Sequence, residues 1–287
     1  MTVTIDQAYI SAYSDNVHRL VSQEMSKVRP LVNITSEKGE KIFKERFGTL
    51  VVSDVTGRWQ DTVPQDTAHS RRMITTVKKS CPAFLDNIDL LKMMIDPTSN
   101  ITQEMASAHG REFDDVMIAA MLGSAATGVA GAGTQAFDSA MQVAHGSTGF
   151  TVVKFNDAMQ LLEAKEVDID REELFLLLGA NGVADLMAEE KFTSFDYAAG
   201  KALSSRGLPT FRGVNIIRTQ RVPVHTPSSI YRGLLLTGKA MAANISKDIE
   251  IHADVIPHKN HAIQIVAYMT YGAVRMEESL IVDVLFQ

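Results

Sequence analysis

Three histidines have the most evident potential for chemistry: His252, His258 and His261, which cluster around a proline in the C-terminal part of the chain. Three imidazoles can bind zinc when hydrogen-bonding partners orient the rings. No predicted helix carries two of these histidines, and the single cysteine, Cys81, lies far away in the sequence. We therefore expect solvated loop histidines, no metal site, and a buried, unreactive thiol at Cys81.

A glycine-rich stretch at residues 128–133 resembles a dinucleotide-binding loop at first sight. That kind of site requires a strand, a tight turn and then a helix N-terminus that faces the phosphates. Here the glycines follow a predicted helix and occur in the reverse order, which favours a flexible linker. We expect no bound cofactor.

Two adjacent carboxylates, Asp114 and Asp115, lie in a predicted helix close to Arg111. Paired carboxylates can act as acid and base, but adjacent residues point to different faces of a helix. We expect Arg111, Asp114 and Asp115 to form local or intersubunit salt bridges instead. An enzyme built on an α/β lobe is the alternative, but it requires a constellation of catalytic groups, and the sequence shows none. We predict that the protein is not an enzyme.

The composition is that of a globular protein, with 287 residues, 45% of them hydrophobic and 22% charged. No apolar run is long enough to span a membrane, and the N-terminus does not have the pattern of a secretory signal. The formal net charge of −6 disfavours a dedicated nucleic-acid-binding protein. We therefore expect any DNA contact to be weak and non-specific.

The first half of the chain predicts an N-terminal amphipathic helix, a long hairpin and a long helix. Residues 1–28 have an apolar repeat of three or four, which predicts an amphipathic helix that docks on the body or on a neighbouring subunit. Val, Ile and Thr at residues 49–53 and 73–77 predict a long hairpin, with a polar tip at residues 60–70. Residues 97–122 predict a helix of roughly 35–40 Å, which ends at Gly123.

The hairpin supplies the candidate interface residues. A two-stranded hairpin is not stable alone in water, so we expect it to lie across a neighbouring subunit. Trp59, with Arg58 beside it, would anchor that contact, because aromatic residues and arginine are enriched at interfaces. Arg71 and Arg72, like the doublet Lys78-Lys79, would contact acidic groups of the neighbour. The alternative for these doublets is a solvated strand.

The second half predicts an α/β lobe followed by strands. We expect helices at 156–166 and 182–190, strands at 174–178, 214–218 and 234–236, and a short helix at 239–243. Alternating apolar residues predict antiparallel strands at 249–256, 262–276 and 280–286.

This order of elements resembles the major capsid protein of tailed bacteriophages, the Hong Kong 97 type, an α+β fold. The local likeness rests on short motifs spread over nearly the whole chain: Phe47-Gly48-Thr49, His69-Ser70-Arg71-Arg72-Met73, Met94-Ile95-Asp96-Pro97-Thr98-Ser99, 114–123, Tyr271-Gly272-Ala273-Val274-Arg275 and Ile281-Val282-Asp283-Val284. The resemblance implies an N-terminal arm, an extended hairpin loop, and peripheral and axial domains. The boundaries that it implies are 1–46 for the arm, 47–80 for the loop, 81–148 plus 251–287 for the peripheral domain with its spine helix at about 97–122, and 149–250 for the axial domain.

The resemblance also implies a function and partners. Copies of the chain would form hexamers and pentamers that enclose a double-stranded DNA genome in an icosahedral shell, assembled in the host cytoplasm and found in the virion. Only residues 1–46 precede the hairpin, so we expect a separate scaffolding protein, with a portal and a decoration protein as further partners. Some relatives crosslink a hairpin lysine to an asparagine, and nothing in the sequence identifies such a pair. An encapsulin-like nanocompartment shell of the same fold is the alternative.

Overall fold

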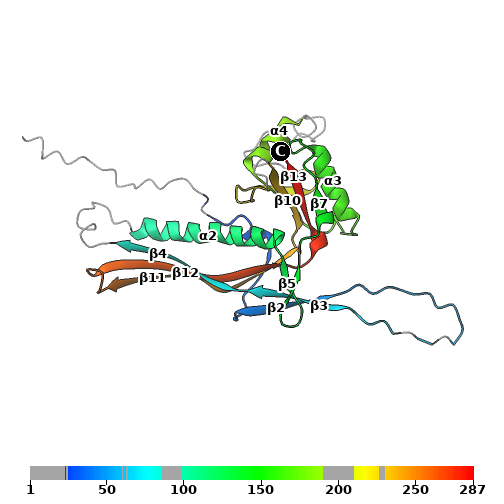
Figure 1. Ribbon diagram of the computed structural model, residues 1–287, viewed down its shortest axis with the longest axis horizontal. Coiled ribbons are helices and arrows are strands. Elements are labelled where there is room, and N and C mark those ends of the chain that lie inside the picture. The colour runs from blue at the N-terminus through cyan, green and yellow to red at the C-terminus, as the bar shows by residue number, and fades with distance from the viewer. Residues whose placement is uncertain are drawn as a thin grey trace, which may run out of the picture.

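The computed structural model describes residues 23, 25–59, 61–62, 64–85, 98–189, 210–225 and 230–287. The molecule is elongated, with a lobe at one end of a long sheet and a hairpin that extends away from both (Figure 1). Most of the helix predicted for residues 1–28 lies outside the described residues. Its described end, 25–28, is not helical and leads into a 3-10 turn at Arg29–Leu31.

The long helix α2 (Thr98–Leu122) lies along a four-stranded sheet (Figure 1). It ends at the predicted residue. Its side chains Phe113, Met117 and Met121 are buried against the sheet. These bulky residues therefore remove a large apolar area of the helix from water.

The sheet beneath α2 has the order β1-β11-β12-β4. Its strands are β1 (Asn33–Thr35), β11 (Met241–Ile256), β12 (Ala262–Arg275) and β4 (Val77–Leu85). β11 and β12 are antiparallel, as predicted. The predicted short helix at 239–243 is wrong: Ala242 pairs with Val274 on one side and with Asn33 on the other. The alanines there favour a helix locally, but two strand partners satisfy their backbone groups.

The lobe is built on a five-stranded sheet with the order β7-β13-β10-β8-β9. Its strands are β7 (Gln142–Val143), β13 (Ile281–Phe286), β10 (Tyr231–Thr237), β8 (Leu174–Leu178) and β9 (Val214–Arg218), and the helices α3 (Val152–Glu163) and α4 (Ala180–Ala188) pack against it. The bounds predicted for β8 and β9 are confirmed. α3 begins four residues earlier than predicted, where the Thr151 hydroxyl accepts a hydrogen bond from the Lys154 amide at 3.4 Å.

The last strand does not remain with its predecessor. β13 pairs antiparallel with β10 and parallel with β7, so the chain returns to the lobe after a 3-10 turn at Glu278–Leu280. A division of the chain that follows the sheets therefore places residues 281–286 with the lobe, and residues 241–250 with the long sheet.

The third sheet, β2-β3-β5-β6, carries the hairpin. Its strands are β2 (Lys41–Phe47), β3 (His69–Thr75), β5 (Ala125–Thr127) and β6 (Gly133–Gln135). The predicted strand at 49–53 is wrong, because those residues have no pairing strand and β2 precedes them. The expected flexible linker after α2 is instead the β5–β6 hairpin. Gly131 has φ +72°, and a Cβ there would lie 2.2 Å from the Met73 sulfur, so only glycine fits that turn.

Candidate assembly interface

The hairpin loop, residues 48–68, projects from the end of β2 and β3 (Figure 1). The Gly48 amide donates to the Ala68 carbonyl at 2.8 Å, which closes the ladder. Further out, the side-chain amide of Gln65 replaces a strand partner for Val51: its oxygen lies 3.1 Å from the Val51 amide and its nitrogen 2.6 Å from the Val51 carbonyl. The loop is therefore tied at its base and open to solvent beyond it.

The loop and the last residue of β2 carry a group of exposed apolar side chains: Phe47, Leu50, Val51, Val52, Val55 and Trp59. Their exposed fractions run from 62% for Leu50 to 96% for Trp59. Apolar side chains gathered on a projecting loop mark a surface that a partner covers. Trp59 and the exposed Arg58 beside it were predicted for this role, whereas residues 50–52 were interpreted as part of a strand.

The base of the hairpin is held by Arg72, which is 4% exposed. It donates to Glu278 Oε1 at 2.6 Å and to the Met276 carbonyl at 3.3 Å. Burial lowers the pKa of Arg72, and the facing Glu278 opposes that shift. The charge of Arg72 is therefore satisfied inside the chain, and its predicted contact with a neighbouring subunit stays a prediction.

The other residues of the two basic doublets, 71–72 and 78–79, also have partners within the chain. Arg71 points to the opposite face of β3 and donates to Glu45 Oε1 at 2.6 Å. Lys79 lies 2.9 Å from Glu112 on α2, and the Lys78 ammonium lies 3.9 Å from the centre of the Tyr268 ring. Arg71, exposed on its strand, stays a candidate for contact, since a surface ion pair is easily exchanged.

A fully buried arginine, Arg275, connects the hairpin base to the end of the long helix. It donates to the carbonyls of Met121 and Gly123, each at 2.7 Å, and to that of Gln135 at 3.1 Å. A cation at a helix C-terminus satisfies carbonyls that lack helical partners. Burial lowers the pKa of Arg275. The carboxylate of Glu278 lies 3.6 Å from the Arg275 Nε and opposes this shift. Nothing in the sequence around Arg275 indicated this role.

The charged residues of α2 form contacts inside the chain. Arg111 pairs with Glu104 at 2.6 Å, and Asp115 pairs with Arg221 at 3.1 Å. Burial raises the pKa of Asp115. Asp114 is fully buried and accepts hydrogen bonds from the segment that precedes the 3-10 turn: from Gln23 Nε2 and Ser26 Oγ at 2.5 Å, and from the amides of Lys27 at 3.0 Å and Val28 at 3.1 Å.

Among the described residues, no three metal-ligating side chains come together. His252 instead lies 3.2 Å from Glu250, whose pKa is lowered by its contacts with Lys247 and His252. Cys81 is half-buried on β4, not fully buried as expected, because it lies at the edge of a small cluster beneath α2. Within the described ranges, no helix has the length and apolar character that crossing a membrane requires.

Comparison with known proteins identifies the family. The model of the family described as "Phage capsid protein" matches residues 5–287. The chain belongs to the phage capsid protein family. None of the curated protein sequences matches it.

Solved capsid structures share the fold at low sequence identity. The chain is similar to the capsid of the cyanophage P-SCSP1u, with TM-score 0.75, 12% identity, and coverage of 99% of this chain and 94% of that one. It is also similar to a structure of Mycobacterium phage Che8 (TM-score 0.73, 15% identity, 95% of each chain) and to the capsid of cyanophage Pam1 (0.73, 12%, 96% and 95%).

The predicted family and fold are therefore confirmed: this capsid protein has the Hong Kong 97-type α+β fold and forms the shell of a phage. The family has a structural role in the virion. Its match over nearly the whole chain disfavours an encapsulin-like nanocompartment.

Proposed function

We propose that this capsid protein tiles an icosahedral shell as hexamers and pentamers around double-stranded DNA, with the hairpin of each subunit lying on the next. The observation that carries the proposal is the contrast within the hairpin. Its base is fixed by Arg72 and Arg275 through buried hydrogen bonds, while its loop exposes Leu50, Val52 and Trp59. A rigid base that presents apolar side chains is suited to repeating one contact around a ring.

The contact is heterologous, because the loop of one copy meets a different surface of the next, and rotation closes the ring. A stable contact of this kind buries more than about 1,000 Å². The loop residues Arg58 and Trp59 supply part of it, and Arg71 lies where the loop joins the sheet. We assign 1–46 to the arm and 47–76 to the loop. The peripheral domain consists of α2 with β4, β11 and β12, and the lobe, including β7 and β13, forms the axial domain.

The remaining parts of the proposal concern partners. A separate scaffolding protein would guide assembly in the host cytoplasm, and a portal and a decoration protein would complete the shell. The net charge of −6 implies weak, non-specific contact with the packaged DNA. The protein would act through its interfaces alone, without catalysis or a cofactor.

Deletion of residues 52–64 tests the proposal, because it removes most of the exposed loop and leaves the Gly48–Ala68 hydrogen bond that closes the ladder. The expected result is a folded subunit, with unchanged circular dichroism and melting temperature, that forms no shells in negative-stain electron microscopy when it is co-expressed with its scaffold. Normal shells from the deleted chain would contradict the proposal.

A pair of point variants provides the matched control. Val52→Ser changes a valine that is 95% exposed in the loop, and Val129→Ser changes one that is 82% exposed at the β5–β6 turn. Only Val52→Ser is expected to lower the yield of shells. Equal losses would mean that general surface polarity matters and that the hairpin has no special role.

A further inference from the structure

The outer half of β11 carries an apolar strip that the described residues leave uncovered. Ile249, Ile251, Ala253 and Val255 alternate with Asp248, Glu250, His252 and Asp254 along the strand. Alternation of this kind places Ile251, Ala253 and Val255 on one face of the sheet, and Ile249, at the register shift before Glu250, lines the cavity at the end of this row. Ile251 is 41% exposed and Val255 is 56% exposed, although the pattern is that of a strand with a buried face.

The strip faces the same side as the helix α2. Ile251 pairs with Ala267 of β12, and Ala253 pairs with Ile265. Directly opposite residues share a face, and both β12 residues are buried in one cluster with Met105 of α2. The helix therefore covers β12 and leaves the adjoining face of β11 open. The register with β1 ends at Asn244, so the outer edge of β11 beyond it is also unpaired among the described residues.

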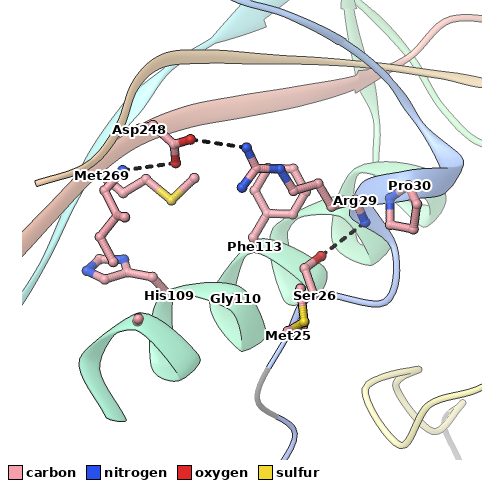
Figure 2. A pocket seen from close by; sticks show the side chains of 11 residues that line it. Met25, Ser26, Arg29, Pro30, His109, Gly110, Phe113, Asp248 and Met269 are labelled. Atoms are coloured by element: carbon pink, nitrogen blue, oxygen red, sulfur yellow. Dashed lines mark hydrogen bonds and ion pairs between the residues drawn. The ribbon is translucent and has the colours of Figure 1, made fainter. Parts of the chain in front are cut away.

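At its inner end the strip opens into a cavity of about 420 Å³ between α2, β11 and residues 25–30 (Figure 2). Phe113, Met269 and Ile249 supply apolar walls. On the side of α2, the lining residues include Ala106 and Gly110, whose small size leaves room for another element to approach the helix.

The chain enters the described structure at the mouth of this cavity. Met25, which is 79% exposed, and Ser26 line it, and Figure 2 shows both beside Phe113. Asp114 fixes this entry point by binding Gln23, Ser26 and the two following amides. Met25 therefore lines the same cavity as Ile249, the first residue of the strip.

We propose that residues 1–22 of the same chain cover the apolar strip of β11. Their sequence has an apolar row at Tyr9, Tyr13, Val17 and Leu20, with the spacing of one helix face. A helix over residues 9–21 is about 20 Å long, and the strip from Ile249 to Val255 is also about 20 Å long. Asp114 binds the chain directly after this segment, and the segment is therefore tethered close to the strip. Its effective concentration at the strip then exceeds that of the same segment from a second copy.

Hydrogen exchange on the purified full-length chain tests the proposal. Peptides from residues 1–22 are expected to exchange at least roughly tenfold more slowly than an unstructured chain. Ile251→Asp should abolish that protection, and the matched variant His252→Asp, on the opposite face, should preserve it. Exchange of residues 1–22 at the unstructured rate in the unaltered chain would overturn the proposal, as would equal protection in both variants.

Disulfide trapping distinguishes the same chain from a second copy. In a Cys81→Ser background, cysteines at positions 17 and 251 should form a disulfide that leaves the chain monomeric on a denaturing gel, and cysteines at 17 and 252 should not. A disulfide-linked dimer would assign the strip to a neighbouring copy and overturn the proposal. Neither experiment depends on shell assembly, so this inference and the proposed function can fail separately.

Discussion

The lobe and the hairpin loop use the same kinds of residue in opposite ways. Every side chain of β8, a leucine-rich strand, is buried, because both faces of the strand are covered. Its leucines at 174, 176 and 178 pack with α3 and α4, and Phe175 and Leu177 pack with α2 and the long sheet. In the hairpin, Leu50 and Val52 are 62% and 95% exposed. Apolar character alone therefore does not decide which residues form the core of the subunit. The sheet of the lobe is completed within one chain, whereas the loop keeps its apolar surface for a partner.

The largest effect is expected at Arg275, which connects the base of the hairpin to the end of α2. Arg275→Met removes donors to three carbonyls and leaves Glu278 with one fewer cation in a buried site. Breaking such a buried network costs about 3–5 kcal/mol in the free energy of unfolding. Urea unfolding of the unassembled subunit measures it, with the exposed Arg71→Met as control. A loss below about 1 kcal/mol, which is the contribution of a surface ion pair, would show that Arg275 is not a structural anchor.

Substitution of one leucine in the lobe and one in the hairpin loop tests whether the two regions differ in their contribution to subunit stability. Leu176→Ala, in the fully buried β8, is expected to lower the free energy of unfolding by about 2–5 kcal/mol, because it leaves a cavity. Leu50→Ala, in the hairpin loop, is expected to change it by less than about 0.5 kcal/mol. Similar losses in the unassembled subunit would mean that the loop is already packed against its own chain.

A smaller loss is expected at Asp114, which binds the start of the described chain. Asp114→Ala leaves the amides of Lys27 and Val28 without their acceptor and should cost about 2 kcal/mol. Asp114→Asn keeps an acceptor and should recover part of that loss. Thermal unfolding of the three proteins gives the order, and an alanine variant as stable as the asparagine variant would contradict it.

The smallest effect on folding is expected for Trp59→Ala. Trp59 is 96% exposed, so its removal should change the free energy of unfolding by less than about 0.5 kcal/mol. In assembly, however, loss of an aromatic anchor at an interface typically costs 2 kcal/mol or more, on the order of a thirtyfold change in affinity. Light scattering measures the effect of the substitution on assembly, and urea unfolding of the subunit measures its effect on folding stability. Equal losses in both would place Trp59 in a core.

Several elements could be predicted to the residue from local pattern. β8 and β9 are short apolar runs flanked by polar residues, and α2 ends before Gly123 as its periodicity indicated. The predictions were wrong where the intrinsic preference of the residues for helix or strand differed from the pairing that the tertiary structure provides. Residues 49–53 have β-forming residues but no pairing strand, and residues 241–243 have helix-forming alanines but two strand partners.

The sequence by itself determined the family, the order of the elements and the existence of a projecting hairpin, because these depend on motifs and periodicities that neighbouring residues carry. Only the tertiary structure decided which charges are internal. Arg71 and Arg72 are adjacent and alike in sequence, but the alternation of the strand places one in solvent and the other beside Glu278. The same holds for Asp114, Arg275 and the strip on β11. Their roles depend on residues far away in the chain, and burial is a property of what surrounds a side chain.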